Sequence, residues 1–168
     1  MIEELKLFKE SKILILGCGN SEFSEELYDF GYKNIYNIDI SENVIKSMKE
    51  RNIKRDKMKC NKSLKLKDEI MDVLNIEYPD NYFDIVIDKS TIDVMFCGEN
   101  SSLNMAIMTK EVQRVLKKNK IYFVVSFGAP ESRAIHFERE HLSFDIKIFT
   151  LKKDVIYKGN KIEKVFVS

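Results

Sequence analysis

Short apolar runs alternate with helical patterns along this chain of 168 residues, and that alternation restricts its fold more than any other feature. Residues 12–16 are almost continuously apolar and end at Gly17, as expected for a strand buried on both faces of a sheet. Further strands are predicted at 34–39, 83–88 and 121–127, and helices at 22–30, after Ser41, and at 103–117. This order is typical of a parallel sheet with helices on both faces.

The C-terminal part of the chain departs from the alternation. Residues 144–151 and 161–167 both have strand character, and Lys158-Gly159-Asn160 between them is typical of a hairpin turn. We therefore predict an α/β fold with a doubly wound, mostly parallel sheet that ends in an antiparallel C-terminal hairpin. Residues 52–70, rich in Lys and Asn, are predicted to form a solvated loop. Because neither a repeat nor a linker interrupts the pattern, residues 1–168 are expected to form a single domain.

A glycine-containing turn lies directly between the first predicted strand and the first predicted helix. Its sequence is Gly17-Cys18-Gly19-Asn20-Ser21, and Asp39 closes the second predicted strand 22 residues after Gly17. Glycine lets the backbone turn sharply and lets a ligand contact the main chain, and a carboxylate at the end of the second strand can accept both hydroxyls of a ribose. This combination predicts a nucleoside-binding site. The alternative is structural: the glycines only make a tight turn, and Asp39 caps a helix.

The ligand of such a site is predicted to lack phosphate. A dinucleotide-binding pattern has a third glycine at the position of Glu22, and Glu25 and Glu26 follow in the same opening turns of the helix. The N-terminal end of a helix is electropositive and attracts a pyrophosphate. Three carboxylates at that end would instead repel the negative charge of a pyrophosphate. S-adenosyl-L-methionine has an adenosine, a cationic sulfonium and a methionine tail but no phosphate, so it fits this pattern.

Several segments, all in one register, resemble a known family. They are Gly17-Cys-Gly-Asn-Ser21, Leu27-Tyr-Asp-Phe-Gly-Tyr32, Asn37-Ile-Asp-Ile-Ser41, Phe83-Asp-Ile-Val-Ile-Asp-Lys89 and Gly128-Ala-Pro-Glu-Ser-Arg133. Over residues 12–151 the chain is similar to the class I, seven-strand methyltransferases of the elongation-factor-1A lysine methyltransferase group, the methyltransferase-like proteins. The resemblance implies a Rossmann-like, seven-stranded sheet, S-adenosyl-L-methionine as cofactor, and a lysine of a translation elongation factor as substrate.

The resemblance also assigns cofactor-binding residues. It implies that Gly17 and Gly19 pass under the methionine moiety, with main-chain groups facing its amine and carboxylate. Asp39 matches the acid that binds the ribose in the family, and Ile40 is expected to pack on the adenine face.

Further contacts are expected after the third and fourth strands. Asp72-Val73 matches the pair that follows the family's third strand, where Asp72 can accept a hydrogen bond from the adenine amine. Lys89 matches a family residue that contacts the cofactor, and Asp88 beside it is expected to contact the cofactor at the mouth of the fourth strand. Each position also has a structural interpretation: Val73 and Ile40 can be core residues, and Asp88 with Lys89 can be a surface ion pair.

Methyl transfer to a lysine requires the neutral amine, because the ammonium has no lone pair with which to attack, and its pKa is about 10.4 in water. The cofactor is already activated, so positioning and desolvation supply most of the catalysis. Asp88 and Asp93 follow the end of a predicted strand. We predict that they are the catalytic residues, which orient the ammonium and pass its proton to water.

The chain departs from the family pattern at several points. The family's N-terminal segment carries Tyr and Trp residues that cover the cofactor, whereas residues 1–11 contain neither. A Gly-Gly turn before the fifth strand is replaced by Asn119-Lys120, and Asp-Lys-Gly-Thr becomes Asp88-Lys89-Ser90-Thr91; Asn tolerates the left-handed conformation. Two alternative functions therefore stay open: methylation of a small molecule, and non-catalytic binding of the cofactor.

Charge and composition argue against several function classes. The 28 basic and 27 acidic side chains give a formal charge of +1, so we expect no nucleic-acid partner bound through phosphate neutralisation. No apolar run reaches the roughly 20 residues that span a bilayer, and the first residues lack the features of a signal peptide. We expect a monomeric, cytoplasmic protein with a protein substrate, in which Cys18, Cys60 and Cys97 are free thiols.

Three other groups of residues are given structural interpretations. His136 and His141 lack the spacing of a metal-binding His-Glu-x-x-His motif, so a solvated helix and no metal site are predicted. Cys18 has no histidine near it in the sequence and is predicted to be a small buried residue rather than a nucleophile. The lysine-rich run at 54–67 is diluted by acidic residues, which is typical of a soluble loop.

Overall fold

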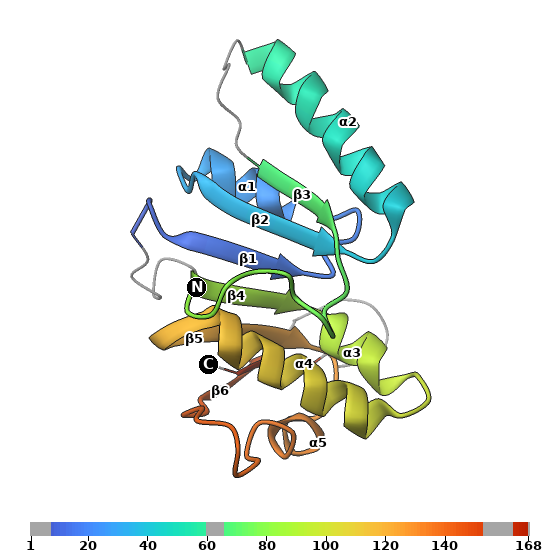
Figure 1. The fold of residues 1–168 in the computed structure, drawn as a ribbon, viewed down its shortest axis with the longest axis vertical. Coiled ribbons are helices and arrows are strands. Elements are labelled where there is room, and N and C mark those ends of the chain that lie inside the picture. Colours follow the sequence, from blue (N-terminus) through green and yellow to red (C-terminus); the bar gives the residue numbers. More distant parts are fainter. Residues whose placement is uncertain (1–7, 60–65, 153–162, 168) are drawn as a thin grey trace.

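The computed structural model describes residues 8–59, 66–152 and 163–167, and its strands form one sheet in the order β3-β2-β1-β4-β5-β7-β6 (Figure 1). The strands are β1 (Lys12–Leu16), β2 (Asn34–Asp39), β3 (Leu66–Ile70), β4 (Phe83–Lys89), β5 (Leu116–Ser126), β6 (Ile148–Lys152) and β7 (Glu163–Val167). The helices are α1 (Phe23–Asp29), α2 (Glu42–Lys59), α3 (Thr91–Phe96), α4 (Ser101–Val115) and α5 (Pro130–Ala134). None of the helices within the described ranges has the length and apolar composition of a membrane span.

Strands β1 to β5 are parallel, and this confirms the α/β prediction. β1 pairs with both β2 and β4, β2 pairs with β3, and β4 pairs with β5. β7 lies antiparallel between β5 and β6, and the predicted turn Lys158-Gly159-Asn160 lies outside the described residues. Because the chain order reverses between β1 and β4, the carboxyl ends of these strands form the edge at which α/β sheets bind ligands.

Alternate residues of β1, an inner strand, are buried against opposite faces of the sheet. Ile13 and Ile15 pack with residues of α1 and α2, whereas Leu14 and Leu16 pack with residues of α4. Figure 1 shows α4 crossing one face while α1 lies on the other. A strand covered on both faces buries apolar area at every residue, which explains why residues 12–16 form a continuous apolar run.

Several predicted element boundaries are wrong. β5 begins at Leu116 rather than at 121, and the helix predicted at 103–117 is Ser101–Val115. Residues 52–70 do not form a single loop, because α2 continues to Lys59 and β3 follows. The strand predicted to begin at Phe144 begins at Ile148. The Phe144 ring instead packs toward the core, with its centroid 6.0 Å from that of Tyr122.

A buried polar network explains why a polar segment folds as α2 and β3. Asn37 Nδ2 and Asn52 Nδ2 donate to the two carboxylate oxygens of Asp68, each at 2.8 Å. The Ser24 hydroxyl donates to Asn37 Oδ1 at 2.5 Å, and all four side chains are buried. Amide and hydroxyl donors thus satisfy a buried carboxylate, and they tie α1, β2, α2 and β3 together.

Candidate functional site at the carboxyl edge of the sheet

The turn after β1 has a backbone that favours glycine at two positions. Gly17 has a φ of +51° and Gly19 a φ of +56°, in the left-handed region. A Cβ atom on Gly17 would lie 2.4 Å from the Oγ1 atom of Thr91, so the turn is in close contact with the start of α3. A Cβ atom on Gly19 would meet nothing within 4 Å. The turn therefore has a packed side and an open side, and the open side can receive a ligand.

Asp39, at the end of β2, lies against this turn. Its Oδ2 atom accepts a hydrogen bond from the Gly19 N–H, and its Oδ1 atom accepts one from the Ser41 N–H, both at 2.9 Å. Main-chain groups thus orient the half-buried carboxylate, while each oxygen can still accept a second hydrogen bond. This arrangement fits a ribose whose two hydroxyls donate to the two oxygens. The alternative that Asp39 caps a helix is not seen, because the Ser41 hydroxyl accepts the hydrogen bond from the Val44 N–H of α2, at 3.4 Å.

Apolar side chains flank Asp39 without being covered by the described part of the protein. Ile40 is 72% exposed, and Ile70, at the end of the neighbouring β3, is 54% exposed. Covering such surface with a flat apolar ring is worth about 25 cal/mol per Å², so the position of Ile40 suits an adenine. Val73 is instead 6% exposed within the core. The Val73 side chain thus packs in the core, as its structural interpretation expects, and the cofactor contact of Val73 stays a prediction.

Asp72 and Lys89 lie at the same edge. The Met71 N–H donates to the Asp39 carbonyl at 3.0 Å, which carries the chain past the end of β2. The half-buried Asp72 carboxylate accepts a hydrogen bond from the Leu74 N–H at 2.9 Å and has acceptor capacity left for an amine. Lys89 is the exposed last residue of β4. Both positions are compatible with the predicted cofactor contacts.

Asp88 lies inside the protein, not at the mouth of β4. Its side chain is 0% exposed, and its carboxylate accepts hydrogen bonds from the N–H groups of Thr91 and Ile92 and from the Tyr122 hydroxyl, at 2.8, 3.1 and 3.1 Å. Burial raises the pKa of Asp88 to about 7, although these hydrogen bonds act in the opposite direction. The prediction that Asp88 contacts the cofactor or the reacting amine is therefore wrong, because its buried carboxylate holds the first turn of α3.

Asp93 of α3 lies in a polar cluster beside the ends of β4 and β5. Its Oδ1 atom accepts from the Ser126 hydroxyl at 2.5 Å and pairs with the Arg133 guanidinium at 2.9 Å, and its Oδ2 atom accepts from the Phe127 N–H at 3.1 Å. Arg133 also lies over the Phe96 ring, 3.9 Å from its centroid. An incoming ammonium would therefore share the Asp93 carboxylate with a guanidinium. Sequence reasoning missed Ser126 and the role of Arg133, because their positions reveal no contact with α3.

Arg51 of α2 is a second residue that sequence reasoning missed. Its guanidinium donates to the carbonyls of Asn20 and Ser21 at 3.2 and 2.9 Å, and it pairs with the fully buried Glu25. The glycine turn is thus clamped from α2. The pair also neutralises Glu25, one of the three carboxylates from which a phosphate-free ligand is predicted, so the repulsion of a phosphate at this helix end is weaker than predicted. An arginine in a lysine-rich segment gives no signal of this role in the sequence.

Two other groups are structural in character. Cys18 is 5% exposed, as predicted, and its Sγ atom lies 3.2 Å from Met48 Sδ. Burial, together with the nearby Asp39 carboxylate, raises the pKa of the Cys18 thiol to about 12, which disfavours the nucleophilic thiolate at neutral pH. The solvated helix predicted around His136 and His141 is wrong, because α5 ends at Ala134 and both histidines lie in turns. His136 lies edge-on to Phe96, with ring centroids 4.8 Å apart. In the described ranges, no group of three His, Cys, Asp or Glu residues can hold a metal ion.

Comparisons with known sequences agree with this geometry. A family model described as a methyltransferase domain matches residues 7–164. A curated relative from Bos taurus, named eEF1A lysine and N-terminal methyltransferase, is 43% identical over 135 residues, which are 77% of this chain but 18% of that protein. The Mus musculus protein named EEF1A lysine methyltransferase 4 is 28% identical over 152 residues, which are 86% of this chain and 56% of that protein. The chain thus spans a small part of the first relative and about half of the second.

Solved structures share the fold. A protein described as a SAM-dependent methyltransferase from Methanosarcina mazei superposes with a TM-score of 0.72 at 19% identity, over 99% of this chain and 94% of that chain. A SAM-dependent methyltransferase from Aquifex aeolicus gives a TM-score of 0.66 at 14% identity, over 99% and 86% of the two chains. At these identities the likeness concerns the fold.

Proposed function

This chain belongs to the methyltransferase-domain family, and on that premise we propose that it transfers a methyl group from S-adenosyl-L-methionine to a lysine of an eEF1A-like protein. The observation that carries the proposal is the joint geometry of one edge: the open side of Gly19, the oriented carboxylate of Asp39, and the exposed side chain of Ile40. The names of the Bos taurus and Mus musculus relatives support the substrate class.

The residues at this edge would divide the binding of the cofactor among them. S-adenosyl-L-methionine supplies, when bound, a methyl group activated by a cationic sulfonium. Asp39 would accept the two ribose hydroxyls, and Ile40 would cover one face of the adenine. The turn from Gly17 to Gly19 would face the methionine end with main-chain groups, because Gly19 has no Cβ on its open side. Asp72 and Lys89 would complete the contacts.

Asp93 is our candidate for orienting the substrate amine. Val94, which follows Asp93 in the chain, and Phe127, whose N–H donates to the Asp93 carboxylate, are 65% and 58% exposed. An amine that enters beside them loses water, and it also meets the positive charge of Arg133; both effects favour the neutral amine over the ammonium. Asp93 would then hold the nitrogen in line with the methyl group, and the released proton would pass to water.

Calorimetry with S-adenosyl-L-methionine and with its demethylated product tests the cofactor site. The unaltered protein is expected to bind both, and Asp39→Ala is expected to weaken binding about tenfold or more, because hydrogen bonds to a charged group are worth about 1.5–3 kcal/mol each. Glu138→Ala, at an exposed position of the same charge, serves as the matched control. Absence of binding to either compound by the unaltered protein would overturn the proposal.

Transfer of labelled methyl tests the reaction itself. Incubation with labelled cofactor and purified elongation factor 1A is expected to place the label on the protein, recovered as methyllysine after hydrolysis. Label found only among small molecules of a cell extract would instead establish small-molecule methylation. Retained cofactor binding without any transfer would establish a non-catalytic module.

We propose further that residues 1–168 form one monomeric methyltransferase domain with a seven-stranded sheet that ends in an antiparallel C-terminal hairpin. Cys18 and Cys97 are free thiols, which supports a reducing compartment, and we propose the cytoplasm. Sedimentation at equilibrium tests the monomer: a mass near 19.7 kDa is expected.

A further inference from the structure

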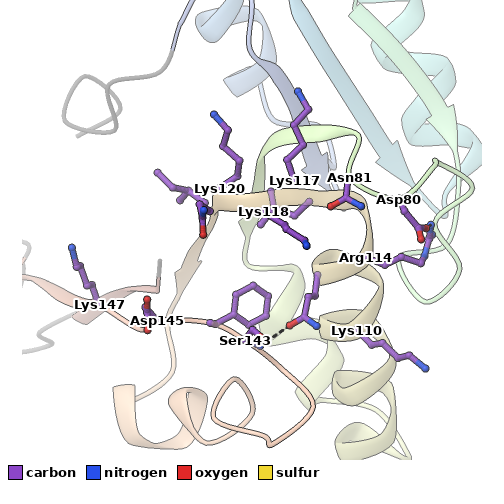
Figure 2. Close-up of a pocket in the computed structure, with 15 residues that line it drawn as sticks. Asp80, Asn81, Lys110, Arg114, Lys117, Lys118, Lys120, Ser143, Asp145 and Lys147 are labelled. Atoms are coloured by element: carbon purple, nitrogen blue, oxygen red, sulfur yellow. Dashed lines mark hydrogen bonds and ion pairs between the residues drawn. The ribbon is translucent and has the colours of Figure 1, made fainter.

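A groove of about 920 Å³ lies at the amino ends of β4 and β5, at the opposite edge of the sheet from the glycine turn (Figure 2). Its walls come from the turn before β4, the last turns of α4, the start of β5 and the segment 143–147. Its acidic lining residues are Asp80 and Asp145. Its basic lining residues are Lys110, Arg114, Lys117, Lys118, Lys120 and Lys147. A chain with a formal charge of +1 thus concentrates positive charge at one edge.

The lysines of this groove differ in how far they are neutralised by the protein. Lys117 and Lys120 share the half-buried carboxylate of Asp84, at 2.9 and 3.7 Å. Three exposed lysines make no ion pair with any other residue that the structure describes: Lys110, Lys118 and Lys147. Figure 2 shows that these three come from different walls of the groove. Their ammonium groups are therefore available to a ligand that carries several negative charges.

The walls of the groove are braced by hydrogen bonds. Arg114 donates to the carbonyls of Tyr78 and Ile76, at 2.8 and 2.6 Å, and also pairs with two carboxylates. Its guanidinium is fully engaged, so it holds the turn before β4 against α4 and leaves ligand binding to the lysines. Gln113 Oε1 accepts the Ser143 N–H at 2.7 Å, which attaches the segment 143–147 to α4 (Figure 2).

The chemistry of the lining favours carboxylates over nucleic acid. Single-stranded nucleic acids are bound by stacking their bases on exposed aromatic rings. Phe144 is the one aromatic residue among the described lining residues, and its ring is engaged with Tyr122 and Phe137, at centroid distances of 6.0 and 6.3 Å.

We propose that this groove binds an acidic peptide segment, a stretch rich in Asp and Glu, of a protein partner. Its carboxylates would pair with Lys110, Lys118 and Lys147. Occupancy of the groove leaves the glycine turn and Asp39 open, because these lie at the other edge of the sheet. The proposal goes beyond methyl transfer and does not depend on it.

Fluorescence anisotropy with a labelled oligoglutamate peptide tests the proposal on the full chain. The unaltered protein is expected to bind, with an affinity that falls as salt is added. A triple variant, Lys110→Ala with Lys118→Ala and Lys147→Ala, is expected to bind about tenfold more weakly, since each exposed ion pair contributes little and three add up. The matched control carries Lys46→Ala, Lys49→Ala and Lys54→Ala, which remove three exposed charges from α2, and is expected to bind as the unaltered protein does.

Several results would overturn the proposal. Equal losses in the two triple variants would mean that net charge alone attracts the peptide. Tighter binding of a single-stranded oligonucleotide than of the peptide, lost in the groove variant, would identify a nucleic-acid surface instead. The groove variant is expected to bind S-adenosyl-L-methionine, measured by calorimetry, as tightly as the unaltered protein does, and this shows that the variant is folded. Because cofactor binding is measured apart from peptide binding, a failure of the methyltransferase proposal is distinguished from a failure of this one.

Discussion

Ser90 has a φ of +71° between β4 and α3, and its side chain makes no capping hydrogen bond. A left-handed conformation is strained for serine and easy for glycine. We therefore expect Ser90→Gly to raise the free energy of unfolding by about 0.5–1 kcal/mol, measured by urea denaturation. Asn119→Gly, at a φ of +58°, is the control and should gain less, because asparagine tolerates this conformation. Equal gains at the two positions would contradict the argument.

Asp88 makes stability depend on pH. Its pKa is raised by burial to about 7 in the folded protein, against about 3.9 when unfolded. Between these values the folded state keeps a proton that the unfolded state has lost, so the free energy of unfolding falls as pH rises from about 4 to about 7 and levels off above. Asp88→Asn does not titrate and should lack this decline.

The difference between the unaltered protein and Asp88→Asn is therefore expected to change by about 2–4 kcal/mol between about pH 4.5 and about pH 8. Urea titrations at the two pH values measure it. A difference that is the same at both would show that the buried carboxylate does not titrate in this range.

Asp93 is the residue with which the proposed amine orientation can be examined. Asp93→Asn keeps the shape of the side chain and removes its charge, so the hydrogen bond with Ser126 can be kept while the ion pair with Arg133 is lost. We expect kcat to fall about tenfold or more while the affinity for the cofactor stays the same. Single-turnover transfer and calorimetry on the same preparation measure the two quantities. Unchanged turnover would exclude Asp93 from the reaction.

Asp39 and Asp88 show how far residue-level prediction reaches. Both are aspartates at or near the end of a predicted strand, and the sequence pattern treats them alike. After Asp39 the chain leaves the sheet, and the carboxylate stays half-buried. A helix begins three residues after each aspartate, at Glu42 and at Thr91, but only Asp88 accepts hydrogen bonds from the first N–H groups of its helix and from Tyr122, and its carboxylate is buried. The contact with Tyr122 joins positions 34 residues apart, and no local pattern contains it.

Among the elements, α2 and β3 depend on the network of buried polar side chains. Asn37→Ala removes both the donor to Asp68 and the acceptor for Ser24. We expect the free energy of unfolding to fall by about 2–4 kcal/mol, because buried groups lose their partners. Asn43→Ala, at an exposed position of α2, should change it by less than about 0.5 kcal/mol. Thermal unfolding of both variants compares them, and similar melting temperatures would show that the network contributes little.

The same network explains which elements could be predicted. β1 carries apolar residues at every position but the first, and β2 carries Ile35, Tyr36 and Ile38, so their burial is visible in the sequence. β3 carries Lys67, Asp68 and Glu69, and it resembles a loop until Asn37 and Asn52 are seen to surround Asp68. Propensity fails here because the partners that make a polar residue suitable for burial lie on other elements.

For the molecule as a whole, the sequence predicts the candidate cofactor edge of the sheet but not the basic groove at the opposite edge. The candidate cofactor edge was predicted because parallel strands bring their carboxyl ends together, so Gly17, Gly19 and Asp39 could be placed side by side from spacing alone. The basic groove collects lysines between positions 110 and 147 from α4, β5 and the following segment. A net charge of +1 conceals such an uneven distribution.

Strand β5 runs from the basic groove to the candidate cofactor edge. Lys120 lines the groove, and the Ser126 hydroxyl donates a hydrogen bond to Asp93. At about 3.3 Å per residue, the six steps between them span about 20 Å. A partner that rests acidic residues in the groove while it offers a lysine at Asp93 must cover at least that span around the outside of the molecule, which takes more than about six extended residues. The length of β5 would thus set a minimum separation between the target lysine and the acidic stretch of a partner. Acidic residues immediately beside the target lysine could not reach the groove while the lysine lies at Asp93, whereas a distant acidic stretch of the partner's chain could.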